Sequence, residues 1–209
     1  MSDLVVTVDG PAASGKSTLA RRLAGWLGLP FLDTGLLYRL VGARLLAAGD
    51  DPDDRDAALR AAQELDESAL ATADLVGDRI GDAASRVGAQ PAVRDALLAF
   101  QRAFADRPGG AVLAGRDTGT VVCPDAPRKL FVTADVEERA RRRFEELRRK
   151  DPAVIYGRVL QDLRERDRRD QTRAVAPLCP AADAFVLDTT DLDPDAAFES
   201  ARAFVVTAT

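Results

Sequence analysis

A short glycine-rich turn near the start of the chain lies between two segments of strongly constrained structure. Residues 4–10 read LVVTVDG, an apolar run that suits a short buried strand. Residues 17–28 place apolar side chains at helical spacing and end at a glycine, which predicts a helix. The turn between them, GPAASGKS at 10–17, matches the pattern G-x-x-x-x-G-K-[ST]. Strand, turn and helix together predict a loop that binds phosphate groups.

Such a loop works through successive backbone N–H groups at a helix N-terminus, which surround phosphate oxygens. Lys16 would reach the β- and γ-phosphates of a nucleotide, and the Ser17 hydroxyl would ligate Mg²⁺. The candidate ATP-binding residues of the turn are Gly10, Pro11, Ala12, Ala13, Ser14, Gly15, Lys16, Ser17 and Thr18. A chance match in a Gly- and Ala-rich turn is the alternative, and the flanking strand and helix argue against it. The chain is expected to bind a nucleoside triphosphate, or to descend from a protein that did.

Further apolar runs follow at 30–35, 109–115, 128–134 and 183–189, and helical patterns separate them. Strands that alternate with helices indicate βαβ units and a parallel sheet that is covered on both faces. The predicted fold is therefore α/β, a three-layer α/β/α arrangement with a five-stranded parallel sheet, of the class that carries a phosphate-binding loop.

A chain of 209 residues suits one domain. Within it we predict a core, a short helical insert and an arginine-rich helical lid. The predicted lid contains two polar helices, 136–150 and 154–169, which an Asp-Pro pair separates. The predicted ranges are about 1–37, 95–135 and 174–209 for the core, 38–94 for the insert and 136–173 for the lid.

Composition excludes several classes of function. The net charge is −5, only 5% of residues are aromatic, and the arginine cluster at 164–173 is interleaved with carboxylates, so nucleic-acid binding is disfavoured. No apolar window is long enough for a membrane span, and the N-terminus lacks the features of a signal peptide. Cys123 and Cys179 are expected to be reduced packing residues, which indicates the cytoplasm. Histidine is absent, so catalysis would rest on Lys, Arg, carboxylates, hydroxyls or a hard cation.

The loop alone does not distinguish GTPases, ATPase motors and small-molecule kinases. The base-reading sequence N-K-x-D of GTPases is missing, and the strand AVLAG lacks the acid that a motor ATPase usually places at its end. A compact chain with an early phosphate loop and a late arginine-rich segment favours a small-molecule kinase.

Four further segments occur in a specific order: LDTGLLYR at 32–39, AASRVGAQPAVRDALLAFQRAF at 83–104, GRDTGTVVCPDAP at 115–127 and RERDRRDQTRAVAPL at 164–178. Together with the phosphate loop they resemble the bacterial cytidylate kinase family, the CMP/dCMP kinases of the nucleoside monophosphate kinase group. The resemblance extends from the first strand to about Asp188.

The resemblance implies that ATP with Mg²⁺ and CMP or dCMP react to give ADP and CDP or dCDP. It implies catalytic roles for Lys16, Arg116, Asp117 and Arg166. It implies contacts of ATP with Arg142 and Arg143, and of Mg²⁺ with Ser17 and with Asp33, the latter directly or through water. The implied CMP-binding residues are Thr34, Arg39, Ser85, Arg94, Arg116, Asp117, Arg166, Asp170 and Arg173. A monomer with small-molecule substrates is expected, without nucleic-acid or membrane partners.

The implied roles within the CMP site differ. Arg39 and Arg116 would bind the α-phosphate, Arg94 and Ser85 the cytosine edge, and Asp170 with Arg166 would lie near the ribose.

Simpler structural roles are open for several of these residues. Arg94 could be a surface arginine, and Ser85 a small helix-packing residue. Asp33 could cap a helix, since Asp is a preferred N-cap. Arg116 and Asp117 could pair with each other.

The lid helices are predicted to present cations to the triphosphate. Arg139, Arg142 and Arg143 share a face at spacings of three and four, and Arg166, Arg169, Asp170 and Arg173 have similar spacings. A solvated face with Glu137–Arg141 and Glu138–Arg142 pairs is the alternative, and we expect the two arrangements to coexist.

Two features depart from the family pattern. Ala114 occupies a position before GRD where the family commonly has an acid, and only 45 residues separate Arg39 from Ser85. A kinase for another small acceptor and a catalytically weakened nucleotide-binding protein therefore remain as alternatives.

Overall fold

Five parallel strands form the centre of the protein in a computed structural model that describes residues 4–65, 75 and 77–207. The order in the sheet is β2-β3-β1-β4-β5. The register places Val6 of β1 between Val112 of β3 and Arg128 of β4. The prediction of a five-stranded parallel sheet is confirmed. The strands are β1 (Leu4–Asp9), β2 (Phe31–Asp33), β3 (Gly110–Gly115), β4 (Arg128–Thr133) and β5 (Phe185–Asp188).

Helices connect the strands, and their ends follow the sequence signals. The first helix ends at Gly28, whose φ of 69° is left-handed, and the next ends at Gly49 with φ 80°. The Asp54 carboxylate accepts from two backbone N–H groups at the start of α3. The helices are α1 (Lys16–Leu27), α2 (Thr34–Ala48), α3 (Arg55–Gln63), α5 (Asp78–Val87), α6 (Pro91–Ala105), α7 (Val136–Arg148), α8 (Tyr156–Thr172) and α9 (Pro194–Thr207), together with the π-helical turn η1 (Thr118–Val122).

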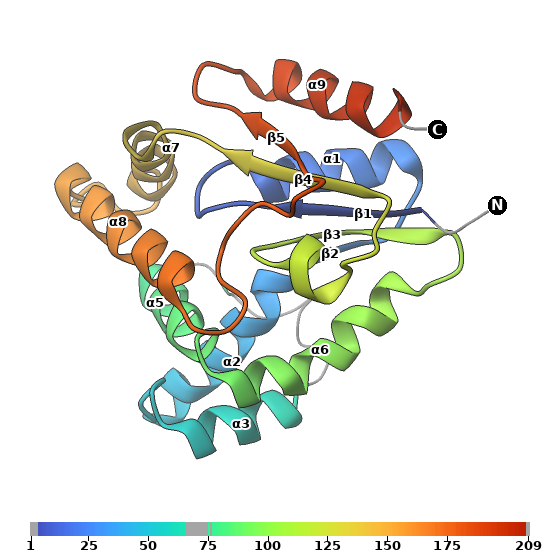
Figure 1. The fold of residues 1–209 in the computed structure, drawn as a ribbon. Helices are drawn as coiled ribbons and strands as arrows, with labels where there is room; N and C mark the ends of the chain where they lie inside the picture. The colour runs from blue at the N-terminus through green and yellow to red at the C-terminus, as the bar shows by residue number, and fades with distance from the viewer. Residues whose placement is uncertain (1–3, 66–74, 76, 208–209) are drawn as a thin grey trace.

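Alternation along the strands produces the three layers (Figure 1). Val6 and Val8 of β1 pack with Leu23 of α1 on the face that α1 and α9 cover. Val5 and Leu113 belong to the other face, where α6 and η1 pack. Successive side chains of a strand point to opposite faces, so both faces of this central sheet are buried.

A separate apolar cluster fills the space between the helices that follow β2. It joins α2, α3, α5 and α6 through residues such as Leu37, Val41, Val87 and Leu97. The described part of the predicted insert is helical, and its residues 66–74 and 76 lie outside the described residues. None of the described helices is long and apolar enough to cross a bilayer.

The two helices of the predicted lid, α7 and α8, pack against each other and against the phosphate loop. Ala140 of α7, with Val159 and Leu163 of α8, forms a cluster with Ala12. Figure 1 shows β4 pointing toward α7, so the pair lies beyond the carboxyl end of the sheet.

The two cysteines have different environments. Cys123 is half-buried and packs against the cluster under β3, whereas Cys179 is exposed, so the predicted packing role is wrong for Cys179.

Leu113→Ala should lower the free energy of unfolding by about 2–5 kcal/mol, because the fully buried side chain leaves a cavity in the sheet face that α6 covers. Urea unfolding followed by circular dichroism measures the change. Val186→Ala is the control, since Val186 is 53% exposed on β5 and its loss should cost no more than about 0.5 kcal/mol. Equal changes in the two variants would contradict the assignment of the core.

Candidate active site

The predicted site residues gather where the parallel strands end. The chain leaves β1 through the loop at 10–17, leaves β2 at Asp33, and leaves β3 at Arg116. Parallel strands present their carboxyl ends at one edge, and ligands of open α/β sheets bind there. Three segments that are distant in sequence therefore reach one place.

At the start of the loop at 10–17 the backbone passes so close to β4 that only glycine fits. Gly10 has φ +154°, and a Cβ at this position would lie 2.0 Å from the Val132 carbonyl oxygen. The buried Lys16 begins α1, and its Nζ donates to the Pro11 carbonyl at 3.1 Å. Ser17 follows half-buried, and Thr18 is exposed. The loop thus presents the start of a helix and a lysine across its own opening.

Cations surround this lysine. Burial lowers the pKa of Lys16 well below its usual value, and the charges of Arg116 and Arg166 lower it further. Burial also lowers the pKa of Arg166 to about 9, with Arg116, Arg39 and Arg143 adding to the effect. The Arg166 Nε is buried without a hydrogen-bond partner among the described residues. Like charges held this close favour an anion between them.

A small cavity of about 50 Å³ brings together eight of the nine residues that the resemblance assigned to CMP. They come from α2, α5, α6, the end of β3, and α8 with the residue after it. Arg39 lines a neighbouring cavity of about 370 Å³ instead, beside Ala12, Ala13 and Arg143. Arg166 lines both cavities. The eight residues are Thr34, Ser85, Arg94, Arg116, Asp117, Arg166, Asp170 and Arg173.

Three ion pairs join residues that line the small cavity. Arg116 Nε donates to Asp170 Oδ2 at 2.8 Å. Arg94 makes a short contact with Asp117, and Arg173 Nη2 lies 3.7 Å from the other Asp117 oxygen. Asp117 is thus paired with Arg94 rather than with Arg116, and the hypothesis of an Arg116–Asp117 pair is wrong. Each carboxylate faces an arginine from a distant segment.

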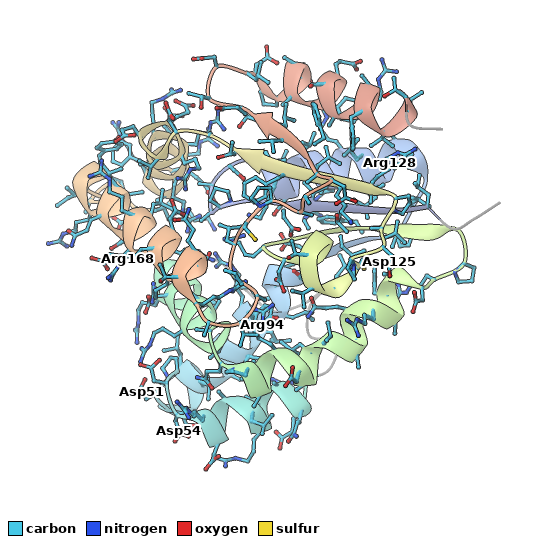
Figure 2. The ribbon with its side chains drawn as sticks, viewed as in Figure 1. Asp51, Asp54, Arg94, Asp125, Arg128 and Arg168 are labelled. Atoms are coloured by element: carbon cyan, nitrogen blue, oxygen red, sulfur yellow. The ribbon has the colours of Figure 1, made fainter. Side chains whose placement is uncertain are left out.

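Arg94 and Ser85 are both buried. Arg94 is only 7% exposed, so it is not a surface arginine; Figure 2 labels it beside α6. Ser85 is also buried, and its hydroxyl lies 3.4 Å from Asp170 Oδ1. Burial raises the pKa of Asp170, but the charges of Arg116 and Arg166 outweigh this effect, so the pKa lies below its usual value. Asp170 is therefore an ionised carboxylate at neutral pH.

The residues at the end of β2 are held by local contacts. The Asp33 carboxylate accepts from the Gly35 N–H at 3.0 Å and caps α2, which confirms the simpler structural role of this residue. Its charge nonetheless acts on Lys16, which places it near the phosphate loop. Thr34 Oγ1 donates to the Ala114 carbonyl at 3.0 Å.

The two adjacent arginines of α7 point into different cavities. Arg142 lines a third cavity of about 370 Å³ with Ser14, Gly15 and Thr189. There its guanidinium donates to Thr189 Oγ1 at 3.1 Å and to the Thr189 carbonyl at 2.5 Å. Arg143 instead lines the cavity that contains Arg39 and Arg166.

The prediction that Arg139 faces a triphosphate is wrong. Its buried guanidinium donates to the carbonyls of Ala134 at 2.8 Å and Ala12 at 3.2 Å, and it forms a bidentate pair with Asp167 at 2.6 and 3.1 Å. One side chain thereby joins α7, α8 and the phosphate loop. Helical spacing showed which residues share a face of α7 but not the carboxylate that α8 brings to this face.

The predicted solvated pairs occur in part. Glu138 pairs with Arg142 at 2.8 Å, as predicted. Glu137 pairs with Arg164 of α8 at 2.8 Å instead of with Arg141, which binds Glu138 and Glu145. Arg169 pairs with Asp82 of α5 at 2.7 Å. The outer ion pairs therefore run between helices as well as along them.

Sequence reasoning missed two buried residues at this edge. Thr189 follows β5 and bonds with Ser14 and Thr133, and Asp9 ends β1 directly before the phosphate loop. The signal for both was their position: each is a polar residue at or just beyond the carboxyl end of a strand.

Comparison with known sequences agrees with this arrangement. The sequence model of the family described as cytidylate kinase matches residues 6–204. The chain belongs to the cytidylate kinase family. It is 58% identical over 204 residues to a cytidylate kinase of Paramagnetospirillum magneticum, covering 96% of this chain and 97% of that one. It is 56% identical over 205 residues to a cytidylate kinase of Methylocella silvestris, covering 98% and 95%.

A solved structure shares the fold of this cytidylate kinase family member. An uncharacterized protein from Eubacterium ventriosum superposes with a TM-score of 0.57 at 15% identity, covering 98% of this chain and 99% of that chain. At this identity the likeness concerns the fold alone.

Ala114, which departs from the pattern of the cytidylate kinase family, is fully buried. It belongs to the apolar cluster around Val8 and Leu19, and it is the register partner of Asp33 on β2. A carboxylate is therefore present one strand away from the position where the family commonly has one.

Arg139→Ala should lower the free energy of unfolding by about 3–5 kcal/mol, because it leaves the Asp167 carboxylate without its partner in a site that is 14% exposed. Urea denaturation measures this loss. Arg141→Ala removes an exposed arginine from the same helix and should leave the midpoint unchanged. A small effect of Arg139→Ala would show that the contacts of Arg139 with Asp167 and with the Ala12 and Ala134 carbonyls contribute little to the stability of the fold.

Proposed function

We infer that this protein transfers the γ-phosphate of ATP to CMP or dCMP and forms ADP with CDP or dCDP. The observation that carries this conclusion is the cation Arg166, which lines both a cavity beside the phosphate loop and the small cavity of paired arginines and carboxylates. A phosphoryl group passing between two nucleotides needs such a bridge of positive charge. Membership of the cytidylate kinase family supports the same reaction.

On the donor side, we propose that the N–H groups of residues 10–18 and Lys16 hold the phosphates of ATP. Arg142, in the cavity with Thr18 and Thr189, would contact the rest of the donor nucleotide, and Arg143 would face the transferred group. Burial, together with the charges of Arg116 and Arg166, lowers the pKa of Lys16, and the negative charge of a bound triphosphate would oppose this effect.

The oxygen atoms at this edge fit Mg²⁺, which prefers oxygen ligands and keeps several waters. No group of three or more His, Cys, Asp or Glu residues that could hold a metal occurs in the described part of the chain. The ion would therefore be held by the Ser17 hydroxyl, by the ATP phosphates and, directly or through water, by Asp33. Bound Mg²⁺ neutralises charge on the β- and γ-phosphates.

On the acceptor side, the Arg94–Asp117 pair complements the cytosine edge. Cytosine presents an N4 donor beside N3 and O2 acceptors, and this pair offers a carboxylate beside a guanidinium, with Ser85 in the same cavity. Uracil has an acceptor where cytosine has N4, so the carboxylate would disfavour UMP. Arg39 and Arg116 would bind the α-phosphate, Asp170 with Arg166 would lie near the ribose, and Thr34 and Arg173 would complete the acceptor site.

Catalysis would rest on position and charge. The attacking oxygen belongs to a phosphate that is already anionic, so a strong general base is unnecessary. Water must be excluded, and α7 and α8 beside the phosphate loop would form the cover that closes over both substrates. We further propose a monomer in the cytoplasm; both cysteines are free thiols, which suits a reducing compartment.

An acceptor panel tests the function. Purified protein with ATP and Mg²⁺ is expected to release ADP fastest with CMP or dCMP, and more slowly with UMP, AMP or shikimate, in a coupled assay. A preference for another acceptor would favour a different small-molecule kinase. ATP binding without CDP formation at high enzyme concentration would favour a catalytically weakened nucleotide-binding protein, which Ala114 suggests.

Arg166→Ala and Asp170→Ala should each lower kcat/KM for CMP by about 10²- to 10³-fold, because one removes transition-state charge and the other an acceptor contact. The Kd of ATP, measured by calorimetry, should change much less than the use of CMP. Arg164→Ala is the control on the same helix, since Arg164 is 57% exposed and pairs with Glu137. Equal losses at all three positions would mean that α8 presents only a solvated face.

A further inference from the structure

The buried carboxylate of Asp9 lies between the phosphate loop and the segment that carries Arg116 and Asp117, and it has no role in the proposed binding of either substrate. Asp9 is the last residue of β1, directly before Gly10, and is only 4% exposed. Its Oδ1 accepts from Thr118 N at 2.9 Å and from Thr118 Oγ1 at 2.8 Å, and its Oδ2 accepts from Gly119 N at 2.7 Å. All three donors belong to the first residues of η1, which follow Arg116 and Asp117.

Through these contacts Asp9, at the end of β1, caps the N-terminus of η1. The first N–H groups of a helix have no partners within it, and the residue before η1, Asp117, makes no side-chain cap bond. Within η1, Val121 N and Val122 N bond with the Asp117 carbonyl. The N–H groups of Thr118 and Gly119 are instead satisfied by Asp9, and a carboxylate at a helix start is electrostatically favourable.

The start of η1 packs closely against β1, and Gly119 has no room for a side chain. A Cβ at Gly119 would lie 2.8 Å from Thr7 Oγ1 and 3.4 Å from Asp9 Oδ2. Asp9 itself is held by its strand, because β1 pairs with β3 on one side and with β4 on the other. If the acceptor were weakened, the short turn would move rather than the strand.

We propose that Asp9 is a positioning residue for the acceptor nucleotide: its ionised carboxylate fixes the start of η1 and so places Arg116 and Asp117 opposite Asp170 and Arg94. The inference rests on the proposed function. Asp9 touches no substrate in this role and acts through the backbone of η1.

The environment of Asp9 adds a dependence on pH. Burial raises the pKa of this carboxyl to about 6; the hydrogen bonds from Gly119 and Thr118 oppose the rise, and the charge of Asp117 adds to it. The other titratable groups that face it are Cys123 after η1 and Lys129 of β4, whose Cδ passes Gly119 and whose Nζ pairs with Asp183.

Protonation of Asp9 should affect the placement of η1 and the free energy of unfolding differently. Because the pKa is above that of a free Asp, the folded state binds the proton more tightly than the unfolded state does. Protonation as the pH falls through about 6 therefore does not destabilise the fold through Asp9. It does replace an acceptor by an O–H donor among three donors. The rate with CMP should therefore decline as the pH falls, whereas the contribution of Asp9 to folding should not.

Asp9→Asn tests the proposal, because it keeps the size of the side chain and removes the charge. Its NH₂ group cannot accept a hydrogen bond, so one of the three donors would lose its partner. At pH 7.5 we expect kcat/KM for CMP to fall by about 10²-fold through misplacement of Arg116 and Asp117, with the Kd of ATP little changed. The variant should remain folded by urea unfolding.

The acid side of the pH profile provides the readout that a purely structural role would not move. A nucleotide phosphate also titrates near pH 6, so log kcat/KM for CMP should fall with a slope of about two in the wild type and about one in Asp9→Asn. Thr118→Val removes one donor but keeps the charge of Asp9, so it should cause a smaller loss and retain the wild-type slope.

Asp54→Asn is the matched control. Asp54 also accepts from two backbone N–H groups at a helix start, each at 3.0 Å, and Figure 2 places it at α3 on the periphery. This variant should leave both substrates and the pH slope unchanged. A wild-type slope in Asp9→Asn, or equal losses for ATP and CMP, would overturn the proposal. If Asp9→Asn does not fold, a wild-type slope of one or an unaltered KM for CMP in Thr118→Val would overturn it. If the wild-type protein uses neither CMP nor dCMP, the proposed function itself fails.

Discussion

Burial lowers the proton affinity of Lys16 and of Arg166, and neighbouring cations lower it further: Arg116 and Arg166 act on Lys16, and Arg116 acts on Arg166. A cluster of this kind is unfavourable in the free protein unless anions offset it. Asp170, between Arg116 and Arg166, is one such anion from the protein itself. We propose that the phosphates of the two substrates supply the remainder. The same repulsion that opposes the empty arrangement then favours the complex with both nucleotides.

The carboxylates give this cationic site its geometry. Asp167, Asp170 and Arg166 lie within five residues of α8, yet they contact different parts of the protein. Asp167 binds Arg139 of α7, Asp170 binds Arg116 after β3, and Arg166 points into both cavities. A rigid helix that carries all three would move them together. If α8 closes over the substrates as proposed, its movement would be coupled to the small cavity and to the phosphate loop without any additional element.

The features that could be predicted from sequence are those set by local spacing. The strand before Gly10, the helix after it and the stop at Gly28 follow from runs and periods of a few residues, and the structure has them where expected. The prediction that the eight residues of the small cavity belong to one site came from the resemblance, because nothing in the spacing of Ser85 and Asp170 shows that they meet. Contacts between distant segments could not be predicted. Arg139 and Arg143 lie on the same face of α7, but Arg139 pairs with Asp167 of α8 whereas Arg143 lines a cavity.

Repulsion limits the number of carboxylates that can lie close together at the carboxyl edge of the sheet. Asp33 on β2 and Asp9 on β1 flank β3, and Asp33 is in register with Ala114 while Asp9 is in register with Gly115. Asp9 is buried with three hydrogen-bond donors, and its pKa is nevertheless raised. A third carboxylate at 114, in an apolar cluster beside Asp33, would be costly to bury and would repel the other two unless a cation were bound there. Alanine at this position therefore adds no further negative charge beside Asp33 and Asp9, and we propose that metal binding is left to Ser17, Asp33 and the phosphates of the substrate.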